Sequence, residues 1–174
     1  NISIMKRMVL FLMICMVAGS LYAQKYAIIH SQNILSALPE YTSAQEQIAR
    51  LQEQYQEKLQ AEYDALEEMF QQYQKDKADL TAQQRRIYEQ QILDREKEVK
   101  ALQEQYFGQE GTLAKTSEVL FKPIQERMQD TVRQIAESQG YSMVLDIASG
   151  MGVIYYAPQT DISDLVIARL QGVR

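Results

Sequence analysis

Apolar residues recur every three or four positions through the first half of the chain, separated mainly by Gln, Glu, Lys and Ala. Between residues 48 and 73, seven steps from one apolar residue to the next cover 25 residues, a mean of 3.6. This spacing is the period of an α-helix, so the pattern predicts one long helix with a single apolar stripe. The stripe comprises Ile48, Leu51, Tyr55, Leu59, Tyr63, Leu66, Phe70 and Tyr73.

The helical pattern breaks at residues 75–86, KDKADLTAQQRR. Within this stretch, Thr81 and Gln84 have the spacing of a capping box, in which a hydroxyl and an amide satisfy unpaired N–H groups at a helix start. A turn near residues 80–81 predicts a second helix that retraces the first, so that the numbers of facing residues sum to 161. The pairs that meet this condition are Tyr73 with Tyr88, Leu59 with Leu102, Tyr55 with Tyr106 and Ile48 with Leu113, and the pairs that misfit are Leu66 with Arg95 and Leu51 with Glu110. The sequence therefore predicts an antiparallel coiled-coil hairpin.

Two prolines and two glycines are expected to punctuate this hairpin. Pro39 suits a helix start, and Pro123 should kink or end the returning helix. Because their numbers sum to 162, both are expected at the base of the hairpin. Gly108 and Gly111 each weaken a helix interior by about 1 kcal/mol relative to Ala. We interpret them as a hinge that lets the arm splay, with a close packing contact as the alternative.

Short strand patterns replace the helical pattern at the two ends of the chain. After Gly140, residues 141–147 (YSMVLDI) alternate, the glycines of ASGMG suit a turn, and VIYY (153–156) is typical of a second strand in a hairpin. Pro158 ends that strand, and Asp161 or Ser163 can cap a last helix through LVIARL. Near the other end of the chain, KYAIIHS predicts a third short strand.

Three short strands and one short helix bury little apolar surface, and such small domains are marginal alone. Further copies of the same chain would most simply supply the missing burial, so we expect the sheet to be an oligomerisation body. Its expected residues are Ile28, Ile29, Met143, Leu145, Ile147, Val153 and Tyr155. The predicted fold class is α+β and mainly α, with a helical arm at residues 40–122 inserted into a β-rich body formed by residues 24–39 and 123–174.

Residues 1–23 are predicted to be a cleavable signal peptide. Two cations precede an unbroken apolar run at residues 8–17, small residues follow, and cleavage is expected after Ala23. A transmembrane anchor is the alternative, but the run is half the roughly 20 residues that a spanning helix needs. A lipoprotein is disfavoured because Ile14, not a small residue, precedes Cys15.

Removal of residues 1–23 changes the net charge and the cysteine content of the chain, and with them the classes of function that its composition permits. It takes away two of the 18 cations and none of the 23 acids, so the mature net charge is −7. It also removes the only cysteine, which excludes disulfides and cysteine-based metal or redox chemistry from the mature chain. The acidic balance argues against nucleic acid, whose binding requires Lys and Arg. A mature chain of about 150 residues is one domain by length.

Residue types suited to catalysis are sparse. The single histidine, His30, ends the first predicted strand, and we interpret it as structural because no second imidazole or nucleophile motif accompanies it. The glycines of ASGMG lack the lysine and the following helix of a phosphate-binding loop. We therefore expect no enzymatic activity, no cofactor and no metal site.

Two segments flank the Gln/Glu-rich hairpin. Together with the hairpin and the signal peptide, they resemble the Skp/OmpH family of periplasmic chaperones. The resemblance covers essentially the whole mature chain. The two segments are YAIIHSQNILSALPEYTSAQEQI and GYSMVLDIASGMGVIYYAPQTDISDLVIARL, and the second is the more specific. The resemblance implies a jellyfish-shaped homotrimer, with a small β-barrel body and three helical tentacles around a cavity. It also implies that unfolded outer-membrane proteins are held there without ATP on their way to the outer membrane.

One departure from the family concerns charge. Its best-known members are strongly basic, whereas residues 40–122 carry 11 cations and 17 acids, a net charge of −6. This balance argues against carrying over the binding of lipopolysaccharide or anionic lipid. Only the tip is locally positive, through Lys75, Lys77, Arg85 and Arg86. We interpret it as a solvated helix end, with a weak contact to an anionic membrane surface as the alternative.

The arm near its tip also offers soft and aromatic side chains, which adapt to many apolar segments. Many weak contacts inside a cage raise effective concentration without a specific pocket. The expected client-binding residues are Met69, Phe70, Tyr73, Leu80, Ile87 and Tyr88. Packing within the hairpin is the alternative, preferred for Tyr73 and Tyr88, whereas Met69 is expected to be the better exposed. The competing function is a structural coiled-coil spacer of the cell envelope, which would bind a fixed folded partner.

Overall fold

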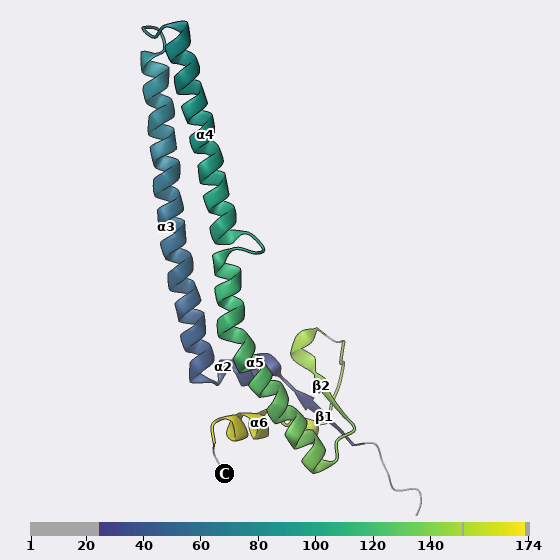
Figure 1. Cartoon of the computed structure of the whole chain (residues 1–174). Helices are drawn as coiled ribbons and strands as arrows, with labels where there is room; N and C mark the ends of the chain where they lie inside the picture. Colours follow the sequence, from purple (N-terminus) through teal and green to yellow (C-terminus); the bar gives the residue numbers. More distant parts are fainter. Residues whose placement is uncertain (1–24, 151, 173–174) are drawn as a thin grey trace, which may run out of the picture. The chain divides into compact units, whose positions relative to one another are not determined.

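The computed structural model describes residues 25–150 and 152–172, so the predicted signal peptide lies outside the described residues. The elements in order are β1 (Tyr26–Ile29), α2 (Ser31–Ser36), α3 (Pro39–Asp76), α4 (Ala82–Phe107), α5 (Thr112–Gln139), β2 (Met143–Asp146), the 3-10 helices η1 (Ile147–Ser149) and η2 (Pro158–Thr160), and α6 (Ser163–Leu170) (Figure 1). Long helices and one strand pair confirm the mainly α, α+β class.

The chain divides into two compact units. The hairpin unit is Leu35–Arg127 and contains the whole predicted arm, residues 40–122. The terminal unit is formed by the two ends of the chain, of which residues 25–34 and 128–172 are described apart from residue 151. The division falls inside α2 and inside α5.

The ends of α3 and α4 follow the local sequence signals. Pro39 is the first residue of α3, where its missing N–H removes no helical hydrogen bond. At the start of α4, the Gln84 N–H donates to Thr81 Oγ1 over 3.2 Å, and the Thr81 N–H donates to Gln84 Oε1 over 2.9 Å. Both halves of the predicted capping box are therefore present.

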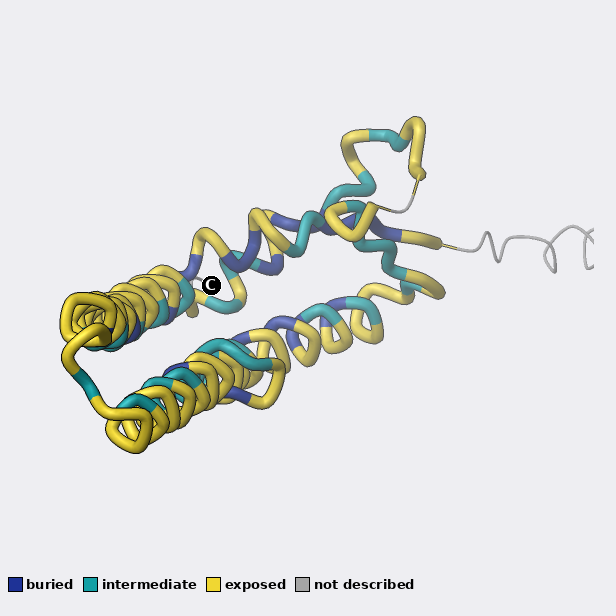
Figure 2. The backbone as a smooth tube through the Cα atoms, turned by 90° about the horizontal axis from the view of Figure 1, so that it is seen from above, coloured by how far each residue is buried: buried dark blue, intermediate teal, exposed yellow. Residues whose placement is uncertain are grey.

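Aromatic contacts confirm the predicted antiparallel register. The rings of Tyr55 and Tyr106 stack with 4.2 Å between centroids, and those of Tyr73 and Tyr88 lie 6.3 Å apart. In Figure 2 the buried and half-buried positions form an interrupted stripe along each hairpin helix, and the remaining positions are exposed. A two-helix hairpin has no third layer, so the outer edges of the stripe remain in water.

The predicted misfit at Arg95 is resolved by charge pairing. The Arg95 guanidinium forms a short ion pair with Glu62 across the hairpin and a 3.0 Å bond to Glu98 on its own helix. A flexible stem lets Arg95 follow apolar surface while its charged head reaches these carboxylates at the edge.

The returning helix is interrupted between Phe107 and Thr112. Gly108 ends α4 and donates its N–H to the Glu104 carbonyl over 2.8 Å; a Cβ on Gly108 would lie 2.5 Å from that same oxygen. A Cβ on Gly111 would lie 2.9 Å from the backbone N and O of Gly108. These approaches support the close packing contact, and the hinge stays a prediction.

The expectation that Pro123 could end the returning helix is wrong, because α5 continues through it to Gln139. Proline removes one helical hydrogen bond, here the bond to the carbonyl of residue 119 four positions earlier. Val119 is 71% exposed, so water can reach this part of the helix and solvate the carbonyl.

The terminal unit is organised around a parallel strand pair that joins the two ends of the chain. Tyr26 aligns with Met143 and Ile29 with Asp146, and Ile28 also bridges to Asp161. The strands predicted from KYAIIHS and YSMVLDI are therefore present, the second as Met143–Asp146. The core residues of this unit are Ala27, Ile28, Ile29, Ile34, Met128, Ile135, Ile162 and Val166.

The predicted hairpin through VIYY is wrong, because residues 152–157 form neither strand nor helix. The chain leaves β2 through η1 instead of a hairpin turn. Asp146 Oδ1 accepts from the Ala148 N–H over 3.1 Å, and Ser149 Oγ donates to the Asp146 carbonyl over 2.6 Å. These local bonds wind the chain into a 3-10 turn, and β2 pairs with β1.

Candidate functional surfaces

The six residues predicted to bind clients differ in their exposure. Phe70, Ile87 and Tyr88 are exposed by 44%, 51% and 43%. Tyr73 is buried and its ring packs on that of Tyr88, in line with its preferred packing role. Tyr88 contributes to the same contact yet keeps part of its ring in water.

Met69 and Leu80 are only half-buried. The expectation that Met69 is better exposed than Tyr88 is therefore wrong. The two-helix seam covers only part of a large ring, whereas the unbranched, flexible Met side chain adapts to the available surface. Of the six predicted residues, Phe70, Ile87 and Tyr88 are thus the exposed ones, and they are called the distal apolar residues below. Leu93 of α4, which was not among the six, is also exposed, by 50%.

Polar groups of tyrosines tie the two hairpin helices together. The Tyr63 hydroxyl donates to Gln103 Oε1 over 2.9 Å, and the Tyr73 hydroxyl donates a short bond to Glu89. This bond to Glu89, followed by burial and by the Glu89 charge, raises the pKa of Tyr73. Both rings are consequently held by a polar contact as well as by packing.

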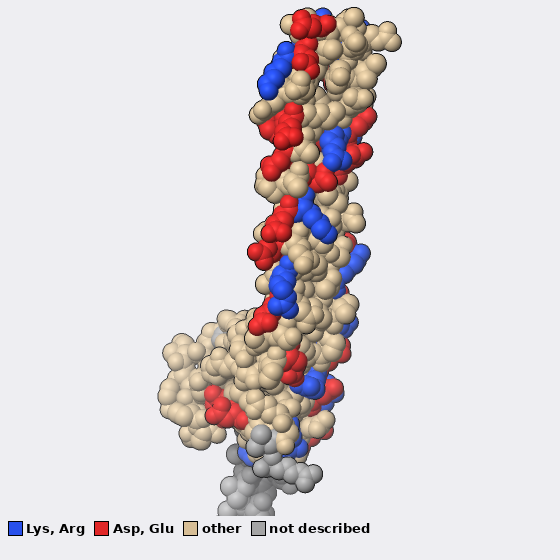
Figure 3. Space-filling view, turned by 90° about the vertical axis from the view of Figure 1, so that its left-hand side faces the viewer, with Lys and Arg blue, Asp and Glu red and all other residues tan. Residues whose placement is uncertain are grey.

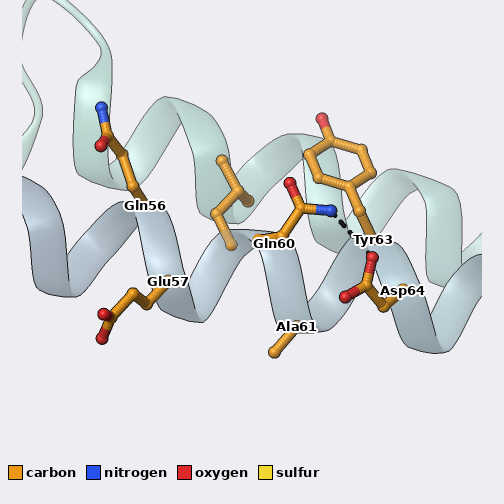
Figure 4. Close-up of a pocket in the computed structure, with 7 residues that line it drawn as sticks. Gln56, Glu57, Gln60, Ala61, Tyr63 and Asp64 are labelled. Atoms are coloured by element: carbon orange, nitrogen blue, oxygen red, sulfur yellow. Dashed lines mark hydrogen bonds between the residues drawn. The ribbon is translucent and has the colours of Figure 1, made fainter.

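An open groove of about 670 Å³ follows one side of α3. Figure 4 shows Gln56, Glu57, Gln60, Ala61, Tyr63 and Asp64 around it, and Leu59 also lines it. Gln60 Nε2 donates to Asp64 Oδ1 over 2.8 Å, so the amide and the carboxylate are held together at the rim. The groove combines apolar surface with hydrogen-bonding groups, a composition that suits a polypeptide segment better than an anion.

The acidic balance of the arm originates in α3. This helix carries nine acids and three cations, whereas α4 carries five of each. On the face of the molecule drawn in Figure 3, acidic and basic side chains are interspersed along the length of the hairpin. Such mixed surfaces are solvated and offer no continuous cationic site for phosphate groups.

Two of the four cations at the hairpin tip already have partners within the chain. Lys77 Nζ lies 5.5 Å from the centroid of the Tyr73 ring, and Arg85 Nε donates to the Leu80 carbonyl over 3.2 Å. These contacts favour a capped, solvated helix end over a membrane-binding patch.

The residues predicted for the oligomerisation body fall into two groups. Ile28 and Ile29 are buried inside the single chain, and Leu145 and Ile147 are half-buried. Met143, Val153 and Tyr155 are exposed, by 82% for Tyr155.

Further exposed apolar residues of the terminal unit were missed by sequence reasoning, namely Tyr26, Ile154 and Leu165. Ile154 is fully exposed. Sequence reasoning assigned only Val153 and Tyr155 of VIYY to the oligomerisation body. Because the segment is not part of a sheet, both of its sides face solvent. Lys25, Tyr26, Ser142, Met143 and Leu145 also line a hollow of about 440 Å³ beside β1 and β2.

His30 lies in a polar cluster of the terminal unit. Its Nε2 is 3.1 Å from the Tyr156 hydroxyl and 3.8 Å from Asp161 Oδ2, and its backbone N–H donates to Ser163 Oγ over 2.9 Å. Asp161 Oδ1 in turn accepts from the Ser163 N–H and hydroxyl, so the Ser163 hydroxyl that accepts from His30 is itself held by Asp161. The two bonds of His30 join the end of β1 to Tyr156 and to the start of α6, in keeping with a structural role for His30.

Asp146 joins β2 to the start of α2. Partial burial raises its pKa, but hydrogen bonds from Ser31 and from the Ala148 N–H, with the charge of His30, outweigh burial and leave the pKa of Asp146 below its ordinary value. Within the described ranges, no three His, Cys, Asp or Glu side chains cluster as metal ligands would. No helix in the same ranges has the length and apolarity to cross a membrane.

A family model described as "Outer membrane protein (OmpH-like)" matches residues 25–170. Among solved structures, one match is a crystal structure from Caulobacter crescentus CB15, described provisionally as an outer membrane chaperone (OmpH-like). It shares 15% sequence identity with this chain and a TM-score of 0.68, over 84% of this chain and 83% of that one. Curated proteins gave no sequence match. The structural likeness bears on the fold, and the family match spans both units.

Proposed function

The chain belongs to the OmpH-like family of outer membrane proteins, and on that premise we propose that it is a periplasmic holdase chaperone. It binds unfolded outer-membrane β-barrel proteins and prevents their aggregation on the way to the outer membrane. The similar protein from Caulobacter crescentus is itself described provisionally as an outer membrane chaperone. The sequence pattern of a signal peptide at residues 1–23 supports export.

The observation that carries the proposal is the exposure of the distal apolar residues on a hairpin whose other exposed positions are mostly polar. Phe70 comes from α3, and Ile87 and Tyr88 come from α4, so both helices contribute. Burial of apolar surface contributes about 25 cal/mol per Å², and each such contact is therefore weak. Weak contacts displayed on several linked arms combine into avidity while accepting many client sequences. Because the binding step is apolar contact, it requires no nucleotide.

The same proposal includes a homotrimer assembled through the terminal unit. Tyr26, Met143, Ile154 and Tyr155 are exposed in the single chain, so each offers apolar surface that a second copy could cover. A second copy that covers them would add the burial that this small unit lacks. Three arms around one cavity would then place their distal apolar residues around a client.

The test is the aggregation of a denatured outer-membrane β-barrel protein diluted into buffer with the mature chain, residues 24–174. Light scattering reports aggregation, and native mass spectrometry reports the stoichiometry. The test variant combines Phe70→Ser, Ile87→Ser and Tyr88→Ser. The matched control combines Gln54→Ser, Gln83→Ser and Gln91→Ser, which shorten three exposed polar side chains on the same two helices.

By native mass spectrometry we expect a complex of three chains without client and of three chains plus one client with it. By light scattering, the test variant should suppress aggregation at least about tenfold less well than the control. A tenfold loss of affinity corresponds to about 1.4 kcal/mol of binding free energy. Equal suppression by both variants would contradict the assigned surface. A stable oligomer that leaves the client to aggregate would favour the structural spacer, for which the buried Tyr73 and the stacked Tyr55 would serve only to stiffen the arm.

A further inference from the structure

The apolar segment at residues 152–155 lies between two parts of the terminal unit that are held by hydrogen bonds, η1 and Tyr156. At its start, η1 is held by the bonds of Ala148 and Ser149 to Asp146. At its end stands Tyr156, whose hydroxyl reaches His30. Within the described part of the chain, the backbone of residues 152–155 makes no hydrogen bond to other backbone groups. No backbone bond of the described chain therefore fixes Ile154 and Tyr155, and the contact of the neighbouring Tyr156 with His30 is the bond next to them.

The Tyr156 anchor connects this segment to the core of the unit. Tyr156 Oη lies 3.1 Å from His30 Nε2, and the two rings meet edge to face with centroids 6.1 Å apart. A tyrosine hydroxyl can donate or accept, so this bond can form with either tautomer of the imidazole. The second neighbour of Nε2, Asp161 Oδ2, is farther away at 3.8 Å.

His30 offers this anchor a fixed position. It directly follows the buried Ile29 at the end of β1, and its N–H is bonded to Ser163 Oγ at the start of α6. Its carbonyl accepts from the Ile34 N–H over 3.0 Å, which ties it to α2 as well. The ring is thus held by a backbone bonded on both sides, whereas Tyr156 belongs to a segment without regular structure.

We infer that His30 and Tyr156 form a clasp that pre-positions the apolar segment 152–155 for contact with a second copy of the chain. This inference rests on the proposed homo-oligomer. Fixing the backbone of a residue costs about 1–2 kcal/mol of conformational entropy, so a segment held in place before association loses less on binding. Tyr156 is adjacent to Tyr155, and its anchorage restricts the direction in which Tyr155 and Ile154 project. His30 is then a positioning residue that acts through Tyr156.

The experiment combines segment mobility with self-association in the mature chain. Because that chain has no cysteine, Gly152→Cys introduces a single site for a nitroxide spin label. A Cβ at residue 152 meets no atom within 4 Å, so the substitution fits. Electron paramagnetic resonance at high dilution reports the mobility of the segment. Sedimentation equilibrium of the unlabelled proteins reports the dissociation constant of the oligomer.

Three variants test the hydrogen bond between His30 and Tyr156, and a fourth variant is the control. Tyr156→Phe removes one hydroxyl, His30→Leu removes the ring nitrogen, and His30→Gln restores a side-chain hydrogen-bonding group at a similar reach. Tyr141→Phe removes the hydroxyl of another tyrosine in the same unit, whose ring lies under Lys25 Nζ at 4.5 Å and is kept.

We expect Tyr156→Phe and His30→Leu each to increase label mobility and to weaken association about 3- to 10-fold, the range expected for one lost hydrogen bond. The double variant should be no weaker than either single variant, because both remove the same bond. His30→Gln and Tyr141→Phe should behave as the wild type in both label mobility and association.

Two results would overturn the inference in different ways. A wild-type chain that remains monomeric at every concentration overturns the proposed assembly, and the clasp with it. A wild-type oligomer whose label mobility or affinity is unchanged by Tyr156→Phe overturns the clasp alone and leaves the proposed function standing.

Discussion

The rings of Tyr55 and Tyr106 lie parallel, with 4.2 Å between centroids and 2° between planes, although the two residues are 51 positions apart in sequence. Phe107 meets the Tyr55 ring edge to face, 6.3 Å away. This cluster joins α3 to the last turn of α4, immediately before the helix break at Gly108. We therefore regard it as the strongest determinant of register in the hairpin.

The first prediction follows from this stack. Replacement of Tyr55 or Tyr106 by Leu should lower the free energy of unfolding, and the double-mutant cycle should show about 0.5–1.5 kcal/mol of coupling beyond lost burial. Urea unfolding followed by circular dichroism measures it. The control cycle pairs Tyr55 with Tyr73, which belongs to a separate stacked pair, and should show no coupling. Equal coupling in both cycles would contradict a direct ring contact.

The capping box at the start of α4 supports a second prediction. Thr81→Ala should lower the free energy of unfolding by about 1 kcal/mol, because it leaves the Gln84 N–H without its acceptor. Thr81→Ser keeps the hydroxyl and should stay within about 0.5 kcal/mol of the wild type. Thermal and urea unfolding of both variants give the comparison. If Ala and Ser have the same effect, the cap does not stabilise the turn.

The two glycines of the α4–α5 break give a third prediction. Gly111→Ala should destabilise the hairpin by about 1–3 kcal/mol, since its Cβ would meet backbone atoms that cannot move aside independently. Gly152→Ala, in open space, is the matched control and should be neutral. Urea unfolding measures both. A neutral Gly111→Ala would contradict the close contact.

The hinge interpretation of the same glycines is tested by motion. If the break is a hinge, Gly108→Ala together with Gly111→Ala should narrow the distribution of distances between spin labels placed on α4 and α5. Double electron–electron resonance gives that distribution. An unchanged width would eliminate the hinge and leave the packing role.

The lowered pKa of Asp146 predicts an acid dependence of the terminal unit. A carboxyl whose pKa is lower in the folded than in the unfolded chain stabilises the fold above its ordinary value of 3.8, and this stabilisation is lost as the pH falls through the lower, folded value. Asp146→Asn should therefore lower the thermal midpoint at neutral pH. The difference from the wild type should shrink below about pH 4.

A control for this experiment is Asp130→Asn, which removes an exposed i,i+3 ion pair with Arg133. Such pairs contribute little, so its thermal midpoint should follow the wild type at every pH. A difference for Asp146→Asn that persists unchanged to pH 2.5 would show that the lost hydrogen bonds, and not ionisation, account for the effect.

The ion pair of Arg95 with Glu62 supports a prediction in which substitution does not lower the free energy of unfolding. Arg95→Leu would place an apolar residue in the stripe at the position where the charge now stands opposite Leu66. Arg95→Leu alone would leave the Glu62 charge without its partner, so Glu62→Met is introduced with it. Because replacing both members of an ion pair by apolar groups is often neutral or stabilising, we expect the free energy of unfolding of this double variant to stay equal or rise by up to about 1 kcal/mol. Urea unfolding tests this, with Glu98→Gln as a control that leaves the Glu62 pair intact. A loss above about 1 kcal/mol would show that the ion pair stabilises the seam.

The local sequence determined most of the hairpin. A mean period of 3.6, the capping box at Thr81 and the position of the turn specify two helices and the residues that face each other, because each of these signals acts within a few positions. The pairs Tyr55–Tyr106 and Tyr73–Tyr88 follow from the turn by counting. The half-buried state of Met69 and the exposure of Tyr88 did not follow, since each depends on how far a two-helix seam covers the side chain.

The terminal unit was decided by tertiary structure. The sequence identified the strands at Tyr26–Ile29 and Met143–Asp146 and assigned both to one body, but it did not give their parallel pairing. Once β2 pairs in parallel with β1, residues from opposite ends of the chain form one core, and Asp146 turns the chain into η1. VIYY has the strand-forming residues of a hairpin, but a strand exists only where a neighbouring edge accepts its hydrogen bonds. Whether this segment forms a strand was therefore determined by pairing between distant parts of the chain, and it could not be predicted from the local pattern alone.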